Sequence, residues 1–363
     1  MPPSLQPIPV NPDRPDPGVI EKAVRALEAG GLILVPTETV YGLAGDPRVP
    51  GVERRIYELK GRDEGKPLPL MAASVAQVLA YGAVMGARAR RLAARYWPGP
   101  LTLVLETPGG EEGFRVPDHA VMRAILEKAG TPLRVTSANR SGEPAATTAA
   151  GAVGALGHGV ALALDGGPCR IGTASSVVRL AGGAFQILRA GAIPEGELAQ
   201  PPVILFVCTG NTCRSMMAEY SFRERLRQSG IGWRTASAGT EAMDGFPASS
   251  LAVRLLAKRG IDGTAHLSSR LTRELVDEAG LIVVMTQFHR MTVLRRFPDA
   301  AHKVRLLKEF DSRSGGGDVE DPFGESSGEY VRILEEIEAA FPELVLAVHE
   351  LERSDRSGGK GQP

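Results

Sequence analysis

The stretch VILFVCTGNTCRS, residues 203–215, decides the fold of the second half of this 363-residue chain. It starts with a short apolar run that predicts a buried strand ending at Cys208. From Ser215 the sequence SMMAEYSFRERLRQSG predicts an amphipathic helix directly after the loop. A loop that leaves a strand and enters a helix N-terminus turns successive backbone N–H groups inward and can hold a tetrahedral anion. We therefore expect an anion-binding loop between Cys208 and Ser215.

Two side chains give this loop a specific chemistry. Arg214 can bind two oxygens of a phosphate group through its guanidinium fork. The same positive field lowers the pKa of a thiol at the base of the loop, so we expect Cys208 to be a thiolate that attacks phosphorus. Zinc is the alternative for Cys208 and Cys213, but the chain has only three cysteines and none of its six histidines shows ligand spacing. The loop favours a nucleophile over a metal site.

The composition is that of an ordinary soluble protein. Apolar residues make up 43% and charged residues 23% of a chain that is long for one hydrophobic core. The 42 basic and 42 acidic side chains cancel, so no global charge favours nucleic acid or an anionic membrane. The cysteines are too few for a disulfide scaffold, the N-terminal residues lack a leader pattern, and no apolar run approaches about 18 residues. We expect a cytoplasmic protein of two domains without a membrane contact.

Short apolar runs alternate with helix-like segments along the chain, which is typical of α/β proteins. The Pro- and Gly-rich stretch AGAIPEGELAQPP, residues 190–202, interrupts this alternation. We predict an α/β domain with a twisted sheet in residues 1–198, a linker in 199–202, and a doubly wound domain with a parallel sheet in 203–353. The polar residues 354–363 are expected to be a disordered tail, and the proline-rich N-terminal segment is expected to be loose as well.

The second half resembles the low-molecular-weight protein phosphatase family. The resemblance rests on the C-x5-R-S loop near the start of the domain and on an Asp-Pro dipeptide in EDPFG, residues 320–324. It implies that Cys208 attacks phosphorus, that Arg214 and the loop amides hold the oxygens, and that Asp321 protonates the leaving group. Asp321 would then act as a base towards water. The same resemblance assigns the phosphate loop and pocket to Thr209, Gly210, Asn211, Thr212, Cys213 and Ser215.

The fourth residue after the nucleophile bears on the choice of substrate. Tyrosine-directed members carry an aliphatic residue there, whereas this chain has Thr212, and VCTGNTCRS resembles the protein-arginine phosphatase branch. The resemblance implies a phosphoarginine-containing protein as substrate, with phosphotyrosine as the alternative. Met216 departs from the proline that usually follows the loop. Arsenate reduction uses a similar loop but needs further thiols, and no cysteine follows Cys213.

The first half carries two polar pairs. In LKGRDEGKPLPL, Lys60 and Arg62 are two apart, and in VTSANRSG, Ser137 and Asn139 are two apart. In extended backbone this spacing places both members of a pair on one face. Cations that face a hydroxyl and an amide suit a triphosphate and a small polar acceptor. Either pair alone is weak support for a site.

Together with PTETVYGL, WPGPLTLVL, RVPDH, LDGGPCRIGTASSVV and ILRAGAI, these pairs resemble the threonylcarbamoyl-AMP synthase family. The resemblance implies that L-threonine, bicarbonate and ATP form the adenylate used for the N6-threonylcarbamoyl modification of tRNA adenosine. It also implies Mg²⁺ with the ATP phosphates, the tRNA-modification machinery as a partner, and a role compatible with tRNA contact. The implied threonine contacts are Thr37, Arg115, Ser137 and Ser175. The implied ATP contacts are Lys60, Arg62, Asn139, Thr147 and Arg189.

Two observations qualify this interpretation of the first half. Met71 stands where some members of the family place a histidine near the substrate. The stretch ARARRLAARYW, residues 87–97, clusters arginines with aromatic residues, so an RNA-binding module without synthase activity is the alternative. At helical spacing, the same stretch is equally typical of a solvated helix face with a buried edge.

Overall fold

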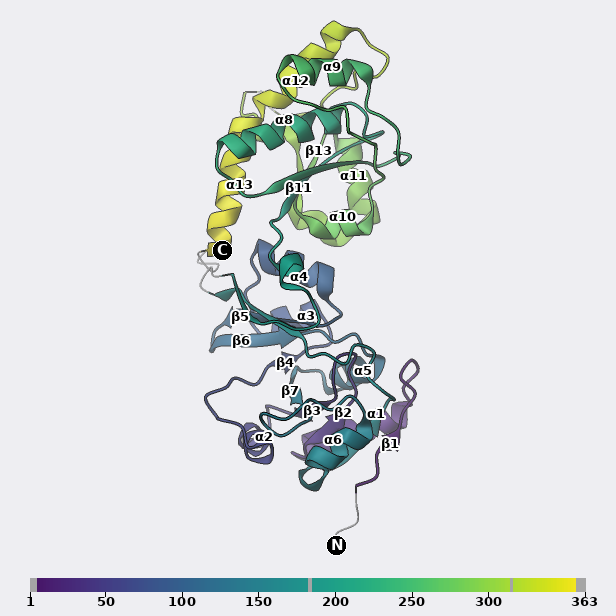
Figure 1. The fold of residues 1–363 in the computed structure, drawn as a ribbon, viewed down its shortest axis with the longest axis vertical. Coiled ribbons are helices and arrows are strands. Elements are labelled where there is room, and N and C mark those ends of the chain that lie inside the picture. The colour runs from purple at the N-terminus through teal and green to yellow at the C-terminus, as the bar shows by residue number, and fades with distance from the viewer. Residues whose placement is uncertain (1–4, 182–184, 314–315, 357–363) are drawn as a thin grey trace. The chain divides into compact units, whose positions relative to one another are not determined.

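The protein is described by a computed structural model that covers residues 5–181, 185–313 and 316–356. The chain divides into two compact units, unit 1 up to Ala199 and unit 2 from Gln200 to Ser354 (Figure 1). Both units are α/β, which confirms the predicted fold class. Most of the predicted tail lies outside the described residues. Within the described part of the chain, no helix combines the length and apolar character needed to cross a membrane.

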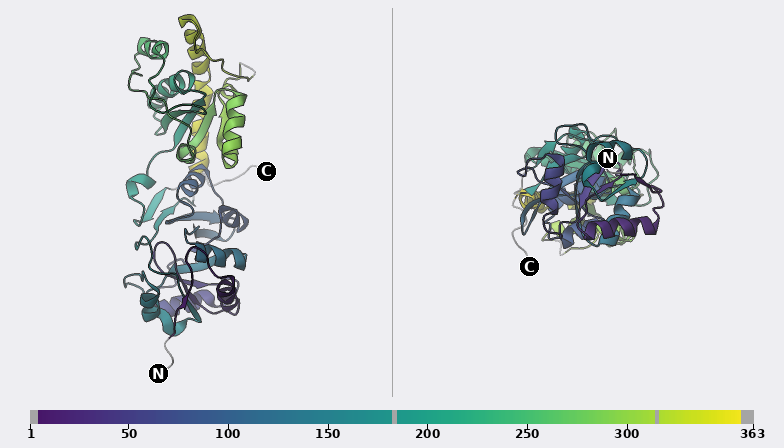
Figure 2. Two further views of the ribbon diagram at one scale, coloured as in Figure 1. Left: turned by 90° about the vertical axis from the view of Figure 1, so that its right-hand side faces the viewer. Right: turned by 90° about the horizontal axis from the view of Figure 1, so that it is seen from below.

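Unit 1 is built on a mixed sheet of ten strands in the order β1-β8-β2-β3-β7-β4-β6-β5-β9-β10. Figure 1 labels β1 to β7 of this sheet, and Figure 2 shows the same ribbon from two further sides. Its strands are β1 (Ile8–Pro9), β2 (Ile33–Val35), β3 (Gly42–Gly45), β4 (Leu70–Met71), β5 (Leu101–Thr107), β6 (Gly110–Arg115), β7 (Leu133–Ser137), β8 (Leu162–Asp165), β9 (Ser176–Arg179) and β10 (Gln186–Arg189). Its helices are α1 (Pro17–Glu28), α2 (Val52–Lys60), α3 (Val75–Ala80), α4 (Ala87–Tyr96), α5 (Ala120–Ala129), α6 (Ala149–Leu156) and α7 (Glu195–Leu198).

The local sequence explains where helix α1 of unit 1 begins and which of its faces is buried. Asp16 caps the helix, because its carboxylate accepts hydrogen bonds from the backbone N–H groups of Gly18 and Val19. Apolar residues at helical spacing bury one face, and they are Ile20, Ala23, Val24 and Leu27. The expectation of a loose N-terminal segment is wrong for residues 8–10. There β1 pairs in parallel with β8, and Val10 joins the hydrophobic core, so buried apolar area holds the segment in place.

Strands β3 and β7 bring distant segments of unit 1 together. Their antiparallel register places Gly42 opposite Ser137, at the end of the strand that carries the predicted Ser137–Asn139 segment. A Cβ atom at Gly42 would lie 2.7 Å from Cγ1 of Val135, so only glycine allows this close pairing. The turn that precedes β3 is thereby fixed next to the end of β7.

Unit 2 contains a four-stranded sheet, and all its pairings are parallel, in the order β12-β11-β13-β14. The strands are β11 (Val203–Cys208), β12 (Arg234–Gly239), β13 (Ala279–Val284) and β14 (Val304–Leu306). The helices are α8 (Arg214–Gln228), α9 (Ser250–Lys258), α10 (Arg273–Glu278), α11 (Gln287–Arg296), α12 (Ser327–Ala339) and α13 (Phe341–Arg356). The doubly wound parallel sheet expected for this half is confirmed.

The central strand β11 explains this architecture. Every residue from Val203 to Cys208 is buried. Alternate side chains enter two different hydrophobic clusters, since Ile204 and Phe206 pack with residues of α8 and α12, whereas Leu205 and Val207 pack with residues of β13 and α11. A strand that is apolar on both faces needs helices on both sides of its sheet. The strand therefore delivers Cys208 to the carboxyl edge of the sheet, where such folds bind ligands.

Candidate active sites

The sulfur of Cys208 lies within a set of hydrogen-bond donors. The backbone N–H of Asn211 donates to Sγ at 3.3 Å, and Oγ of Ser215 lies 3.0 Å from Sγ. The side-chain amide of Asn211 donates to Oγ of Ser215 at 2.9 Å, so the Ser215 hydroxyl hydrogen is available to the sulfur. The loop is therefore arranged to stabilise negative charge on the sulfur, as a nucleophilic thiolate requires.

Asn211 fixes the shape of this loop. It is fully buried and has a left-handed backbone with φ of 57°. Its side chain also donates to Oγ of Ser237 at 2.7 Å and accepts from the backbone N–H of Ser269 at 2.8 Å. Its carbonyl oxygen accepts a hydrogen bond from Nε2 of His266 at 2.7 Å. These partners come from separate segments, so tertiary contacts hold a conformation that non-glycine residues rarely adopt.

The opposite wall of the pocket contains Arg214 and Asp321. Arg214 is buried, donates to the carbonyl of Val319 at 3.0 Å, and forms an ion pair with Asp321, which lies 107 residues further on. Asp321 remains about half exposed, with a side-chain accessibility of 48%. One pocket thus brings together most of the residues predicted for this site. Its lining is Cys208, Thr209, Gly210, Thr212, Cys213, Arg214, Asp321 and Phe323. Of the predicted set, Asn211 and Ser215 do not line the pocket, and they hold the loop from behind.

Thr212 and Cys213 are fixed from outside the loop. The backbone N–H of Ser249 donates to the carbonyl of Thr212 at 2.9 Å. Sγ of Cys213 lies 3.1 Å from the hydroxyl of Tyr330, which lies 3.0 Å from Oγ of Ser249. Burial raises the pKa of the Cys213 thiol. Cys213 is therefore a structural thiol in the loop wall, whereas Cys208 sits at its base.

Three residues near the loop were missed by the sequence analysis. His289 is buried, with Nε2 2.9 Å from Oγ1 of Thr209 and Nδ1 2.8 Å from Oγ1 of Thr286. Burial and the positive charge of Arg214 lower the pKa of His289 to about 4, so the imidazole is neutral at pH 7. The others are His266 and Glu219, whose carboxylate accepts from Ser237 at 2.6 Å. In the sequence, Glu219 is a charged residue among the buried apolar positions of α8, and this pattern could have indicated a functional role.

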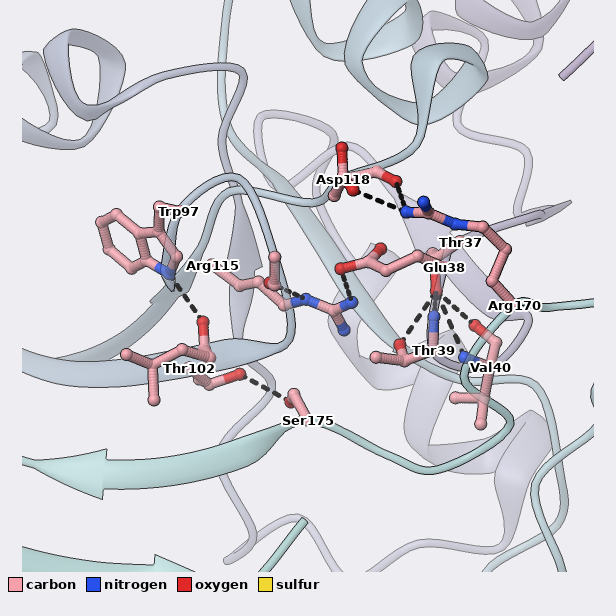
Figure 3. Close-up of polar contacts among 12 residues, drawn as sticks. Thr37, Glu38, Thr39, Val40, Trp97, Thr102, Arg115, Asp118, Arg170 and Ser175 are labelled. Atoms are coloured by element: carbon pink, nitrogen blue, oxygen red, sulfur yellow. Dashed lines mark hydrogen bonds and ion pairs between the residues drawn. The ribbon is translucent and has the colours of Figure 1, made fainter. Parts of the chain in front are cut away.

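In unit 1 the turn before β3 carries a buried ion pair. Glu38 is 1% and Arg115 is 4% exposed, and Oε1 of Glu38 lies 2.7 Å from Nη2 of Arg115 (Figure 3). Nε of Arg115 donates to the carbonyl of Gly99 at 3.1 Å. Thr37 is also buried, but its hydroxyl donates to the carbonyl of Val40 at 2.6 Å and lies 3.0 Å from Oγ1 of Thr39. Thr37 therefore shapes the turn, and Glu38 is a site residue that the sequence analysis did not assign.

A single cavity in unit 1 contains most of the predicted basic side chains. The predicted residues in its lining are Arg62, Arg115, Ser137, Ser175 and Arg189. Arg189 is exposed overall, but its guanidinium donates to the carbonyl of Ser175 at 2.7 Å and to its Oγ at 3.0 Å. Partial burial and the positive charges of Arg115 and Arg62 lower the pKa of Arg189. The cavity therefore concentrates positive charge. Met71, the departure from some family members, also lines it.

The other predicted ATP contacts lie outside the lining of this cavity. Nζ of Lys60 donates to the carbonyls of Ser137 and Asn139, the latter at 2.7 Å, and burial with the nearby Arg62 lowers the Lys60 pKa to about 8. The amide nitrogen of Asn139 donates to the carbonyls of Arg140 and Glu143. Thr147 is exposed, and its carbonyl accepts from the N–H of Cys169. Lys60 and Asn139 hold the segment after β7 in this conformation.

The lining of the cavity bears on Mg²⁺. None of its residues is Asp or Glu. Within the described residues, no three His, Cys, Asp or Glu side chains gather in a way that could hold a metal ion. Mg²⁺ prefers oxygen ligands, carboxylates above all. The residues present do not fit a protein-held Mg²⁺, and such an ion would depend on the oxygens of ATP and water.

The two units define two classes of protein. Unit 2 places a cysteine and an arginine in an anion loop at the edge of a parallel sheet, opposite a carboxylate, which defines a cysteine-dependent phosphatase. Unit 1 is an α/β domain with an arginine-rich cavity. Residues 203–356 match the family model for low molecular weight phosphotyrosine protein phosphatases, and residues 25–191 match the Sua5_yciO_yrdC model, described as telomere recombination. The chain belongs to both families, one in each half.

Individual relatives follow the same division. The chain is 34% identical over 190 residues to threonylcarbamoyl-AMP synthase of Bacillus subtilis, covering 49% of this chain and 55% of the relative. It is 35% identical over 191 residues to a putative threonylcarbamoyl-AMP synthase of Mycobacterium leprae, covering 50% and 86%. It is 40% identical over 141 residues to the protein-arginine-phosphatase of Bacillus subtilis, covering 39% and 93%. The chain thus spans about half the length of the first of these relatives.

A solved structure of a Pyrococcus abyssi Sua5 double variant supports the fold alone. Its TM-score is 0.50 at 23% sequence identity, and the match covers 83% of this chain and 98% of that one.

The buried ion pair of unit 1 gives a first prediction. Replacing Glu38 by Gln leaves Arg115 buried without a counter-charge, so we expect the free energy of unfolding to fall by about 3–5 kcal/mol in urea denaturation of the full chain. Asp118→Asn is the matched control, because Asp118 pairs with Arg170 at 2.5 Å and both side chains are well exposed. Its cost should stay below about 1 kcal/mol. Equal costs for the two variants would contradict the structural importance of the buried pair.

The phosphate loop gives a second prediction. A Cβ atom at Gly239 would lie 2.4 Å from the carbonyl oxygen of Thr209 and 3.1 Å from the backbone N of Asn211. Gly239→Ala should therefore displace the loop, with a loss of about tenfold in kcat on para-nitrophenyl phosphate and about 1–3 kcal/mol of stability. Gly232→Ala is the control, since nothing lies within 4 Å of a Cβ there. Wild-type turnover by Gly239→Ala would show that the loop tolerates this contact.

Proposed function

We propose that unit 1 synthesises L-threonylcarbamoyladenylate from L-threonine, bicarbonate and ATP, for the N6-threonylcarbamoyladenosine modification of tRNA. The observation that supports this is a cavity lined by Arg62, Arg115 and Arg189 without a carboxylate. Such a site suits the phosphates of ATP and the carboxylate of threonine, because guanidinium groups bind both in bidentate geometry. The relatives named threonylcarbamoyl-AMP synthase indicate which nucleotide reaction to assign.

The residues have distinct roles in this proposal. Arg115, held by Glu38, binds the carboxylate of threonine, and Ser137 and Ser175 bind its polar groups. Arg62 and Arg189 neutralise the phosphates while an oxygen of the threonine carbamate attacks the α-phosphorus and pyrophosphate leaves. The reaction needs positioning and charge neutralisation, and it needs no nucleophile from the protein.

We propose that unit 2 is a protein phosphatase that acts on phosphoarginine. The observation that supports a phosphatase is the pocket that joins Cys208, Arg214 and Asp321. Sγ of Cys208 attacks phosphorus, Arg214 and the loop N–H groups stabilise the equatorial oxygens, and Asp321 protonates the leaving nitrogen and later accepts a proton from water. Thr212 in the pocket wall and the 40% identity to a protein-arginine-phosphatase favour arginine over tyrosine.

The alternative of an RNA-binding module in unit 1 receives little support from helix α4. Arg91 is only 3% exposed, the guanidinium of Arg88 lies 4.3 Å from the ring centre of Phe185, and Arg95 lies 3.7 Å from Glu197. These arginines contact their own unit, so the helix does not present a free basic face.

The synthase proposal predicts pyrophosphate release by the intact chain that depends on both threonine and bicarbonate. Arg189→Ala should reduce this rate by about 100-fold, since it removes a cation that stabilises transferring phosphate. Cys208→Ser is the matched control and should leave the rate unchanged. RNA binding without pyrophosphate release would favour the RNA-binding module instead.

The phosphatase proposal predicts a higher kcat/KM for a phosphoarginine peptide than for the same peptide with phosphotyrosine. Cys208→Ser should abolish both activities, because the hydroxyl is a far weaker nucleophile than the thiolate. Thr212→Ile should move the ratio of the two kcat/KM values towards phosphotyrosine by about tenfold or more. A preference for phosphotyrosine that Thr212→Ile does not change would overturn the arginine assignment.

A further inference from the structure

Large apolar side chains are exposed on unit 2 in four segments near the phosphate pocket. Six of them, which we call the apolar rim, are Met243 (68% exposed), Phe246 (50%), Leu267 (61%), Phe288 (54%), Met291 (62%) and Phe323 (76%). Of the exposed large apolar residues in the described part of unit 2, Leu346 alone lies outside these segments. Single exposed apolar residues are common, but a group of them around one site indicates an interaction surface.

The first segment of the rim is attached to two residues of the pocket lining. The backbone N–H of Glu241 donates to the carbonyl of Thr209 at 3.0 Å, and that of Ser249 donates to the carbonyl of Thr212 at 2.9 Å. The loop between Glu241 and Ser249, which carries Met243 and Phe246, is therefore held beside the pocket at both ends.

Leu267 lies next to this loop. The backbone N–H of Ser268 donates to the carbonyl of Phe246 at 2.7 Å, and Pro247 forms an isolated antiparallel bridge with Leu267. Nε2 of His266, the preceding residue, donates to the carbonyl of Asn211 in the phosphate loop. Met243, Phe246 and Leu267 therefore form one side of the rim.

Helix α11 and the Asp-Pro segment supply the rest of the rim. His289 contacts Thr209 of the pocket at 2.9 Å, and Phe288 is its neighbour in the chain. Met291 follows Phe288 by three positions, so the two side chains share one face of the helix. Phe323 lines the pocket itself. The exposed apolar side chains thus extend outward from the pocket on more than one side.

We propose that the apolar rim binds the polypeptide of the substrate on either side of its phosphorylated side chain, and that it selects substrates with large apolar residues near that position. The inference rests on the proposed phosphatase function. Phe323 of the rim lines the pocket that receives the phosphoryl group, and the other rim residues lie on segments that are hydrogen-bonded to the phosphate loop or neighbour such segments. The polypeptide attached to a bound side chain therefore passes close to the rim. Covering it with apolar side chains removes exposed apolar area from water, which favours such flanks over polar ones.

The test uses the full chain and three kinds of substrate. Two peptides carry the phosphorylated residue with Leu or with Ser at the two positions on each side, each made with phosphoarginine and with phosphotyrosine. Para-nitrophenyl phosphate has no flanks and reports the pocket alone. We expect kcat/KM for the Leu peptides to exceed that for the Ser peptides by about tenfold, since each buried apolar side chain contributes to binding.

Variants then assign this preference to the rim. The triple variant Met243→Ser, Phe246→Ser, Met291→Ser should make the Leu and Ser peptides equivalent and leave para-nitrophenyl phosphate hydrolysis within about twofold of wild type. Leu346→Ser on α13, similarly exposed at 59%, is the matched control and should keep the preference. If the wild-type chain hydrolyses para-nitrophenyl phosphate but hydrolyses the Leu and Ser peptides at equal rates, the proposed role of the rim is wrong and the phosphatase function is unaffected. No hydrolysis of any substrate would overturn the phosphatase function.

A second copy of the chain is the other occupant that the rim could have. Sedimentation measurements at several protein concentrations show whether two copies of the chain associate through the rim. If the triple variant abolishes a concentration-dependent dimer and leaves the peptide preference intact, the rim is a self-association surface and the proposal is wrong.

Discussion

The catalytic loop of unit 2 depends on the left-handed backbone of Asn211. A non-glycine residue in this conformation costs of order 1–3 kcal/mol unless its surroundings hold it. Three hydrogen bonds of the Asn211 side chain and one to its carbonyl oxygen provide that support, from Ser215, Ser237, Ser269 and His266. Folding therefore offsets the free energy of this backbone conformation before a substrate binds. Sites that are preorganised in this way stabilise charge that develops during a reaction.

The arginines that line the cavity of unit 1 differ in whether they have a carboxylate partner. Arg115 is buried and has Glu38 as a counter-ion, so its orientation is fixed at little net charge. Among the described residues, Arg62 and Arg189 have no carboxylate partner, and partial burial together with the charges of the other two arginines lowers the pKa of Arg189. The first arrangement favours a precise contact with a small ligand. The second favours the binding of an anion that supplies the missing negative charge.

The proposals for substrate choice in unit 2 involve two parts of the structure, the pocket wall and the apolar rim. Thr212 lines the pocket, and its carbonyl accepts a hydrogen bond from the backbone N–H of Ser249. The loop that ends at Ser249 also carries Met243 and Phe246 of the apolar rim. Thr212, proposed to select the phosphorylated group, and the rim side chains proposed to cover the flanking polypeptide are therefore linked by one backbone hydrogen bond.

The sequence by itself determined the features that are local in the chain. The alternation of apolar runs and helix-like segments predicted the parallel fold of unit 2. The strand, the C-x5-R-S loop and the helix predicted the place of Cys208 and Arg214, because all three lie within one short segment. The spacing of polar pairs likewise pointed to Arg62 and Ser137, but the expected extended backbone is wrong for the first pair, because Lys60 ends helix α2 and Gly61 forms a left-handed turn. Only the tertiary structure showed that Glu38 neutralises Arg115, that His289 contacts Thr209, and that Thr37 and Thr147 lie outside the lining of the cavity. Some of these contacts join residues that are far apart in the sequence, and the others depend on which side chains are buried. A local sequence pattern contains neither kind of information, so it does not identify side-chain partners.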